Sequence, residues 1–513
     1  MEIDLVVQFW EWLKKDYLKF LGAFCLVLAV FGLTRFFNLN RLPIFCDEAI
    51  YLRWAQVANN DPSFRFISLT DGKQPMQTWL TLPLLRLIED PLIAGRVLSA
   101  IAGLLLLLVG ILTAFSFFKD KKNIYFLMFL MVFCPYLIFF DRMALAESLL
   151  TLFAFGAFLF SFLLAKNLRL DIALLAGLWI GVGFLVKSQM LIFLLLFPLG
   201  TIFIFQKEGF RLSKPLVKYL LFFLIITVMV FLIYNIQRLS PWMYRIRQKN
   251  SDFIVPFSEA LTDLKRFGYN FYLSIQWFWF YLTPPIFIVS LLGLILLIKN
   301  NFWQGLYLSV WIFVPALGEA FIARFFTSRY LSFLAPFFLL SAAYFFVKSY
   351  QVLTAIIGKK KIVFFLLLFL IWPIYNIGLL LTNPEDFPFT STDRDYIEGW
   401  TAGYGVKETA DYLKQIARKE KVVVGTEGTF GLLSQGLEIY LMGEENITVK
   451  GYYPLPSLPP QELQEAVQAG KKAYFLVNNT PGDFAKEKFV LKKEYTKAHD
   501  QGSLRFYEIL AEK

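Results

Sequence analysis

The sequence predicts a polytopic α-helical membrane protein that carries a small soluble α/β domain at its C-terminal end. Of the 513 residues, 57% are hydrophobic and 17% charged, whereas soluble proteins are about 45–50% apolar and about 25% charged. Apolar runs long enough to cross a bilayer recur from residue 20 to residue 381. The residues after 381 have a more polar composition. These observations exclude a soluble globular enzyme, a disordered chain and a disulfide scaffold.

Other features exclude several kinds of site and partner. The chain has one histidine, His499, and therefore cannot build an HExxH zinc site or a multi-histidine metal cage. Its three cysteines are widely spaced and form no CxxC motif. We attribute the net charge of +11 to cytoplasmic loops of a membrane protein, and expect no nucleic-acid partner.

Hydropathy and loop charge predict the membrane topology. With the N-terminus in the cytoplasm, Lys and Arg are about twice as dense in the inner loops as in the outer ones, and KDKK at 119–122 is an example. Residues 5–19 are expected to form an interfacial amphipathic helix before the first span. The membrane module then covers residues 1–383, and residues 384–513 form an extracytoplasmic domain. The eleven predicted spans are 20–37, 93–117, 123–140, 144–165, 171–186, 190–206, 216–236, 276–298, 304–322, 330–348 and 362–381.

The first outer loop, residues 38–92, is too long for a simple connector. Residues 46–58 have the spacing of a helix with one apolar face. Residues 76–88 are apolar enough to lie in the membrane interface. The sequence therefore predicts two helices on the outer membrane surface, with the polar turn 70–75 between them.

Ionisable residues gather at the outer side of the predicted spans. A single one could be a snorkelling anchor, but charges of both signs at several outer positions favour a shared polar site. Asp47 and Glu48 open the first surface helix, where the helix dipole favours carboxylates. One of them could also serve as a general base for a hydroxyl nucleophile. The basic residues that could converge on a lipid phosphate are Lys73, Lys187, Arg324 and Arg329.

Several motifs follow one another in a fixed order. They are CDEAIYLRWA (46–55), DGKQPMQTWL (71–80), AGRVLSAIAG (94–103), FDRMALAESLLTLF (140–153), GLWIGVGFLVKSQ (177–189) and SRYLSFLAPFF (328–338). In this order they resemble the sequence blocks of glycosyltransferase family 39 in the GT-C superfamily of membrane glycosyltransferases. That family contains protein O-mannosyltransferases and lipid A aminoarabinose transferases.

The resemblance implies a GT-C-like fold of about 11 transmembrane helices with outer juxtamembrane helices. It also implies transfer of a sugar from a polyprenyl-phosphate donor to an extracytoplasmic acceptor hydroxyl, with inversion and without a metal or cofactor. Asp47 would be the general base, supported by Glu48. The donor phosphate would be bound by Lys73, Lys187, Arg324, Arg329 and Tyr330. The polar cavity would be shaped by Tyr51, Arg96, Asp141, Arg142 and Glu147.

Two departures from the family pattern limit what can be carried over. The chain lacks the inserted luminal domain of eukaryotic protein O-mannosyltransferases, so we expect a prokaryotic cell membrane. It has Lys73-Gln74-Pro75 where the aminoarabinose transferases tend to have Lys-Pro-Pro. The sugar therefore stays open, and the acceptor could be a protein, a lipid or a glycan.

The second large outer loop, residues 237–275, has basic clusters with aromatic neighbours. It is equally consistent with a lid, an acceptor platform or a pair of interfacial helices. In the tail, Asp-Arg-Asp at 393–395 is expected to be a solvated turn, and His499 a surface residue. The tail pattern predicts helices at 406–417 and 429–441, and strands at 421–426, 471–479, 488–495 and 504–510.

Two other functions compete with the transferase. A transporter or flippase for a lipid-linked glycan would be expected to place ionisable residues near the midplane, often with repeat symmetry. Here they gather at one side, and no repeat is evident. A non-catalytic subunit for surface-glycan assembly would not need Asp47, Glu48 and Lys73.

Overall fold

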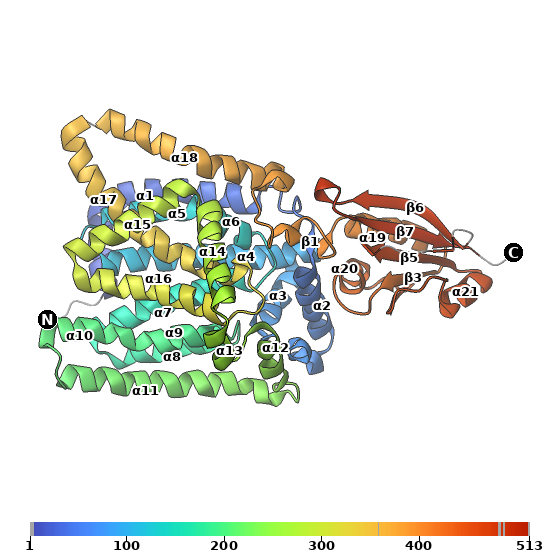
Figure 1. Ribbon diagram of the computed structural model, residues 1–513, viewed down its shortest axis with the longest axis horizontal. Helices are drawn as coiled ribbons and strands as arrows, with labels where there is room; N and C mark the ends of the chain where they lie inside the picture. Colours follow the sequence, from blue (N-terminus) through green and yellow to red (C-terminus); the bar gives the residue numbers. More distant parts are fainter. Residues whose placement is uncertain (1–4, 358, 481–483, 486–487, 511–513) are drawn as a thin grey trace.

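The computed structural model describes residues 5–357, 359–480, 484–485 and 488–510, and it consists of a helical bundle with a sheet domain at one end (Figure 1). Within these ranges seven helices are long and apolar enough to cross a membrane, and two bent helix pairs raise the number to nine. Two further apolar helices are shorter, at Leu170–Phe184 and Leu366–Thr382. This confirms the predicted fold class, whereas the number of eleven spans stays a prediction.

The helices of the bundle follow the predicted apolar runs. The predicted interfacial segment is continuous with the first span, and the helix that contains both loses helical geometry at Asp16. Helices outside the two bent pairs described below are α1 (Leu5–Phe36), α4 (Pro91–Phe117), α7 (Glu147–Asn167), α8 (Leu170–Phe184), α9 (Met190–Leu196), α10 (Ile202–Glu208), α11 (Lys214–Tyr234), α16 (Phe302–Ile322), α17 (Ala335–Ile357) and α18 (Lys359–Thr382).

Two helix pairs are bent where proline begins the second helix. α5 (Lys122–Val132) and α6 (Pro135–Asp141) meet at 59°, and α14 (Leu264–Tyr281) and α15 (Pro284–Asn300) meet at 111°. The predicted span 123–140 crosses the first bend and the predicted span 276–298 crosses the second, so neither is one straight helix. Thr283 has a φ of +74° there, and proline at the next position disfavours helical geometry before it. Hydropathy continues through the bend, but the helix does not.

The predicted first outer loop contains both helices expected there, whereas their place on the outer membrane surface stays a prediction. They are α2 (Cys46–Asn60) and α3 (Met76–Leu87), joined by the short turns η1 (Pro62–Phe64) and η2 (Ile67–Asp71). Gly72 ends η2 with a φ of +68°, and a Cβ there would lie 2.5 Å from the carbonyl oxygen of Arg245. A glycine is therefore required where the second outer loop crosses the first. That second loop contains α12 (Arg245–Phe253) and α13 (Phe257–Thr262), and its role as a lid, an acceptor platform or an interfacial helix pair stays a prediction.

The C-terminal domain is a five-stranded mixed sheet with the order β4-β3-β5-β7-β6. Strands β4, β3 and β5 are parallel, and β7 and β6 are antiparallel. Every predicted element is present, whereas β4 and α21 were not predicted. The strands are β3 (Val422–Glu427), β4 (Ile447–Tyr452), β5 (Lys472–Asn478), β6 (Phe489–Thr496) and β7 (Ser503–Ile509). The helices are α19 (Val406–Ala417), α20 (Leu432–Leu441) and α21 (Gln461–Gln468).

The segment that leads into this domain packs on the bundle. β1 (Ile44–Phe45), just before α2, pairs with β2 (Ala402–Gly403). Asp393 is 1% exposed and accepts hydrogen bonds from the Tyr281 hydroxyl at 2.6 Å and from Thr390 at 3.0 Å. The predicted solvated turn at 393–395 is therefore wrong for Asp393, because the chain returns to the bundle there. His499 lies on the domain surface, with Nδ1 2.6 Å from Glu398.

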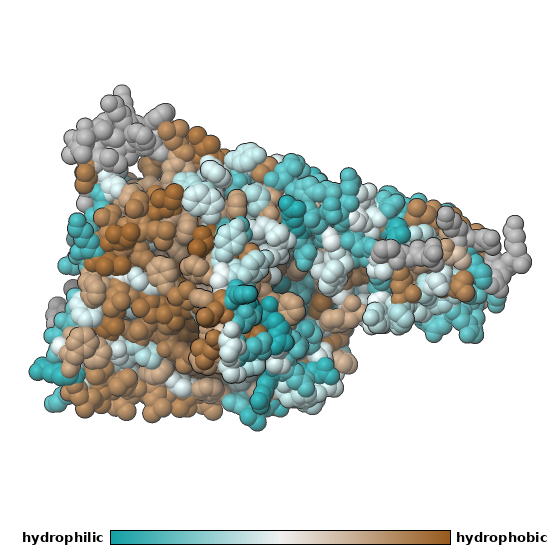
Figure 2. All heavy atoms as spheres, in the orientation of Figure 1, coloured by the Kyte–Doolittle hydropathy of each residue, from teal (hydrophilic) through white to brown (hydrophobic). Residues whose placement is uncertain are grey.

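The surface separates into two parts. Figure 2 shows apolar side chains over most of the bundle, and polar ones over α12, α13 and the C-terminal domain. The bundle is thus suited to lipid. Its polar end, which carries α2, α3 and the domain, is suited to water.

Candidate active site

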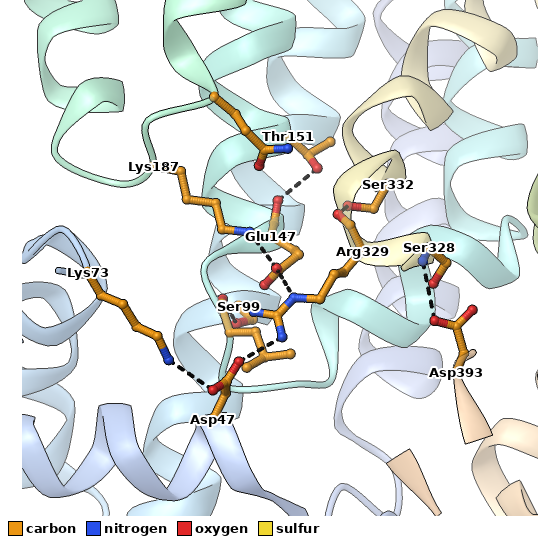
Figure 3. Close-up of polar contacts among 12 residues, drawn as sticks. Asp47, Lys73, Ser99, Glu147, Thr151, Lys187, Ser328, Arg329, Ser332 and Asp393 are labelled. Atoms are coloured by element: carbon orange, nitrogen blue, oxygen red, sulfur yellow. Dashed lines mark hydrogen bonds and ion pairs between the residues drawn. The ribbon is translucent and has the colours of Figure 1, made fainter. Parts of the chain in front are cut away.

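Asp47, in the first turn of α2, lies between two cations that come from distant parts of the chain (Figure 3). Its Oδ1 atom is 2.9 Å from Lys73 Nζ, in the turn before α3. Its Oδ2 atom is 2.7 Å from Arg329 Nη1, in η5 (Ser328–Tyr330) before α17. Burial opposes ionisation, but the charges of Lys73 and Arg329 outweigh it and hold the pKa of Asp47 well below its usual range.

Glu147 extends this network across the start of α7. Its Oε1 atom accepts hydrogen bonds from Lys187 Nζ at 2.7 Å and from Arg329 Nε at 2.8 Å. The Arg329 guanidinium therefore bridges Asp47 and Glu147 (Figure 3). We call Asp47, Lys73, Glu147, Lys187 and Arg329 the ion-pair cluster. It contains three cations and two carboxylates, so one positive charge is left uncompensated within it.

The ion-pair cluster is largely buried, and four of its five side chains are partly exposed. Side-chain exposure is 23% for Asp47, 17% for Lys73, 14% for Lys187 and 12% for Arg329, whereas Glu147 is fully buried. Partial burial strengthens electrostatic interactions relative to those in water. Burial also lowers the pKa of Lys187, against the opposing charge of Glu147. A ligand anion can thus reach cations that are only weakly screened.

Aromatic rings lie beside the two lysines. Lys73 Nζ lies 5.0 Å from the centroid of the Tyr51 ring and 5.7 Å from that of Trp54. Lys187 Nζ lies 5.4 Å from the Tyr330 ring. Burial raises the pKa of both tyrosines to about 12, so each keeps its hydroxyl proton at neutral pH. The predicted residues Tyr51 and Tyr330 therefore border the ion-pair cluster.

Glu48, the neighbour of Asp47, lies in a different environment. It forms a bidentate ion pair with Arg96, at 2.9 and 2.7 Å, and both side chains are 0% exposed. Glu48 also accepts the backbone N–H groups of Phe45 and Ala144. Arg96 donates further to the carbonyl oxygens of Leu39, Leu42 and Pro43. This pair fixes the first outer loop to α4, and among the described residues no side-chain hydrogen bond or ion pair joins it to the ion-pair cluster.

Three more predicted residues lie outside the ion-pair cluster. Asp141 pairs with Arg35 at 3.2 Å and accepts from Ser148 at 2.8 Å. The Arg142 guanidinium donates to carbonyl oxygens at the end of α1. Arg324 is exposed, with its guanidinium 4.0 Å from Glu259. The structure therefore brings together Asp47, Tyr51, Lys73, Glu147, Lys187, Arg329 and Tyr330, and it places Glu48, Arg96, Asp141, Arg142 and Arg324 elsewhere.

Polar residues absent from the predicted set surround the ion-pair cluster. Asp71 lies 3.8 Å from Lys73 and 2.9 Å from Lys249 of α12. Gln189 donates to Glu319 at 2.6 Å. Gln189 Oε1 and Glu147 Oε2 are buried oxygens that have no hydrogen-bond partner among the described residues. In the sequence, Asp71 lies two residues before Lys73 and Gln189 lies two residues after Lys187. This proximity to predicted site lysines was the signal that could have found them.

The described residues contain no group of three or more His, Cys, Asp or Glu side chains arranged to hold a metal ion. Catalysis without a metal nevertheless stays a prediction. The chemistry for which the ion-pair cluster is suited is binding of an anion beside a carboxylate base.

Residues 72–234 match the family model described as dolichyl-phosphate-mannose-protein mannosyltransferase. Over 96% of the chain, the fold is similar to that of ArnT from Cupriavidus metallidurans, and the alignment covers 98% of ArnT. The apo crystal structure gives a TM-score of 0.56 at 14% identity. The structure bound to undecaprenyl phosphate gives 0.55 at 12% identity. The chain therefore has the overall fold of ArnT, and residues 72–234 resemble a mannosyltransferase family. No curated protein sequence matches the chain.

The ion-pair cluster joins residues from inside and outside the family match. Lys73, Glu147 and Lys187 lie within residues 72–234, whereas Asp47 and Arg329 lie outside them. The match covers less than half of the chain, and the low identity to ArnT establishes the fold alone. Donor, acceptor and residue roles are therefore proposals.

Proposed function

We propose that the protein transfers a sugar from a polyprenyl-phosphate carrier to an acceptor hydroxyl outside the cytoplasm, with Asp47 as the general base and with inversion at the anomeric carbon. The observation that carries this proposal is that Asp47 is held between two cations at the polar end of a GT-C bundle. ArnT, which has this fold, was crystallised with undecaprenyl phosphate. A polyprenyl phosphate is thus the carrier we propose here.

Donor binding exchanges one set of ion pairs for another. In the free enzyme Lys73 and Arg329 occupy both oxygens of Asp47, which makes its carboxylate a weak base. A donor phosphate offers these cations and Lys187 a competing anion, and arginine binds phosphate oxygens through two parallel hydrogen bonds. As Lys73 and Arg329 turn to the phosphate, the pKa of Asp47 rises. The base is therefore activated by donor binding.

The transfer step then needs no separate acid. The acceptor oxygen attacks the anomeric carbon and loses its proton to Asp47, while the bond from that carbon to the phosphate oxygen breaks. The donor is a phosphodiester with one negative charge, and the leaving polyprenyl phosphate carries two. Lys73, Lys187 and Arg329 stabilise the charge that develops on it. A single displacement of this kind inverts the anomeric configuration.

Two unpartnered oxygens beside the cations suit the sugar of the donor. Glu147 Oε2 and Gln189 Oε1 are buried acceptors without donors among the described residues. Leaving such atoms unsatisfied costs about 1–3 kcal/mol each. Sugar hydroxyls can supply the missing donors. This part of the site would then contribute to the choice of sugar.

The proposed orientation places the ion-pair cluster and the C-terminal domain outside the cytoplasm. Both lie at the same end of the bundle (Figure 1). α4 leads from that end to KDKK at 119–122, which suits a cytoplasmic loop. Thiol labelling in whole cells tests this, after the native cysteines have been replaced. A cysteine at Gln468 should be labelled in intact cells, and one at Lys119 only after permeabilisation.

Release of free polyprenyl phosphate from protein in nanodiscs tests the function. The substrates are a panel of polyprenyl-phosphate sugars, with a membrane extract as the source of acceptor. Release that selects one sugar and is lost in Asp47→Asn is the expected result. Tight donor binding by both proteins without release, in an extract shown to contain a competent acceptor, would instead support a transporter or a scaffold subunit.

A further inference from the structure

A polar groove of about 750 Å³ lies between the C-terminal domain and the membrane module, apart from the ion-pair cluster. Its walls come from α2, from the connection between α3 and α4, and from α19 and α20. Gln56 lies on this wall of α2, nine residues beyond Asp47. At 100° per residue the two side chains point to opposite sides of the helix. The groove is therefore a second, separate site.

A buried side chain in the groove lacks a partner. Gln56 is 6% exposed, and its amide nitrogen donates to the carbonyl oxygen of Ile439 at 2.8 Å. Its Oε1 atom, which is buried, has no hydrogen-bond partner in the part of the chain that the structure describes. An unsatisfied buried oxygen is costly, and a ligand that donates a hydrogen bond removes this cost.

The charges that line the groove have both signs. Lys407 is already paired with Asp90 at 3.1 Å, and Asp90 also caps the N-terminus of α4. Three further lining residues, Glu89, Asp411 and Lys414, have no ion-pair partner among the described residues. The groove thus offers two free carboxylates and one free ammonium group. This set is complementary to a ligand with one cationic and one anionic group.

The groove borders the start of α4, a candidate membrane span, where we expect lipid headgroups to lie. Residues 88–91 border it, and α4 enters the apolar bundle directly after them. Leu87, at the end of α3, is 79% exposed and faces the surroundings of the bundle with an apolar side chain. Ile88 and Ile93 add an apolar part to the lining. A ligand in the groove can therefore keep its acyl chains in the bilayer.

We propose that this groove binds the headgroup of a zwitterionic phospholipid with a primary ammonium, phosphatidylethanolamine. The ammonium donates to Gln56 Oε1 and to the carboxylates of Asp411 and Glu89, and the phosphate pairs with Lys414. Ammonium carries three hydrogen-bond donors, whereas the quaternary nitrogen of choline carries none. A glycerol headgroup has no cation for the two carboxylates. The bound lipid joins α19 of the domain to the start of α4, and this proposal does not depend on the proposed sugar transfer.

Lipid retention by the full-length protein tests the proposal. The protein is reconstituted in nanodiscs that contain equal amounts of phosphatidylethanolamine, phosphatidylcholine and phosphatidylglycerol. It is then released into detergent, and the lipids that stay bound are counted by native mass spectrometry. For the wild type we expect phosphatidylethanolamine to exceed phosphatidylcholine by about tenfold, the effect of one or two charged hydrogen bonds. Gln56→Leu and Asp411→Asn should bring the ratio close to one.

Controls separate this result from a folding defect. Asp411 is exposed, so Asp411→Asn should leave the fold unchanged. Gln468→Leu, on the exposed surface of α21, repeats the glutamine substitution away from the groove and should keep the wild-type ratio. Equal retention of the ethanolamine and choline lipids by the wild type overturns the proposal. So does a preference that survives in both groove variants, or displacement of the lipid by a soluble oligosaccharide.

Discussion

Two neighbouring carboxylates on the first turn of α2 show how differently the same sequence signal can be used. Glu48 is 0% exposed and is bound by one arginine and two backbone N–H groups, so its partners are fixed. Asp47 is 23% exposed and shares two cations that have other anions within reach. Glu48 and Arg96, which we call the locked pair, hold the loop in place. The ion pairs of Asp47 with Lys73 and Arg329 are shared and partly exposed, and can therefore change partners.

The locked pair also fixes the position of Asp47. Arg96 and Glu48 tie residues 39–45 and the N-terminus of α2 to α4. Asp47 follows directly from this anchored backbone, so its position is set by a neighbour that does not react. Substitutions that affect one pair and spare the other will show whether the two roles are separate.

Apart from loss of the proposed base itself, the largest expected effect comes from removing the arginine that bridges the two carboxylates of the ion-pair cluster. Arg329→Gln should lower the transfer rate by about 10²–10³-fold, because it removes a donor that is aimed at the developing phosphate charge. Arg324→Gln is the matched control, since Arg324 is exposed and contacts only Glu259 among charged groups of the described residues. Rates of polyprenyl phosphate release measure both. A loss in Arg324→Gln as large as that in Arg329→Gln would contradict this assignment.

The second effect is on stability and concerns the locked pair. Glu48→Gln leaves the Arg96 guanidinium buried without its counter-charge, which typically costs about 3–5 kcal/mol. Asp47→Asn removes a partly exposed group and should leave the melting temperature within a few degrees of wild type. Thermal unfolding of both variants in detergent gives the comparison. If Glu48→Gln melted like the wild type, the locked pair would not be the anchor.

A third, smaller effect is a shift in pH dependence. Burial lowers the pKa of Lys187, so its positive charge is lost earlier than that of an ordinary lysine as the pH rises. On this account kcat/KM falls on the alkaline side as Lys187 loses its proton. Lys187→Arg keeps the charge and should move that limb to higher pH. Lys249→Arg, on α12, is the control and should leave the pH dependence of kcat/KM unchanged. If Lys187→Arg did not shift the alkaline fall of kcat/KM, the charge of Lys187 would not be its cause.

The smallest effect concerns the contact between α12 and the ion-pair cluster. Asp71 lies between Lys249 of α12 and Lys73. Asp71→Asn removes a partly exposed pair, and pairs of this kind contribute at most about 1 kcal/mol. We expect KM for the donor to change less than about fivefold and kcat to stay constant. A large fall in kcat would mean that Asp71 takes part in the chemistry.

Much of the fold followed from periodicity, because a period of 3.6 or 2 residues reports directly on local structure. The helices α2, α3, α19 and α20 were predicted in this way. Local pattern could not place Asp393, which is buried because residues far away in the chain, such as Tyr281, supply its donors. The bend before α15 was missed because hydropathy does not register a turn. The pair Pro284-Pro285 was the signal for it.

The site was predictable as a set of residues but not as a geometry. Lys73, Lys187 and Arg329 were correctly predicted to lie together, because each follows or precedes an apolar helix at the same end. Arg324 and Arg329 looked alike in the sequence, and only tertiary packing separates the exposed one from the bridging one. Glu147 was expected to shape the polar cavity, and the structure places it within the ion-pair cluster.

The central claim is that the donor phosphate takes Lys73 and Arg329 from Asp47, which then accepts the acceptor proton. Parallel measurement of polyprenyl phosphate affinity and of transfer rate in Asp47→Asn tests it most directly. We predict affinity equal to or tighter than that of the wild type, because a competing carboxylate is gone. We also predict a transfer rate lower by about 10²–10⁴-fold, the usual contribution of a general base. Weaker binding together with a transfer rate close to that of the wild type would contradict the account.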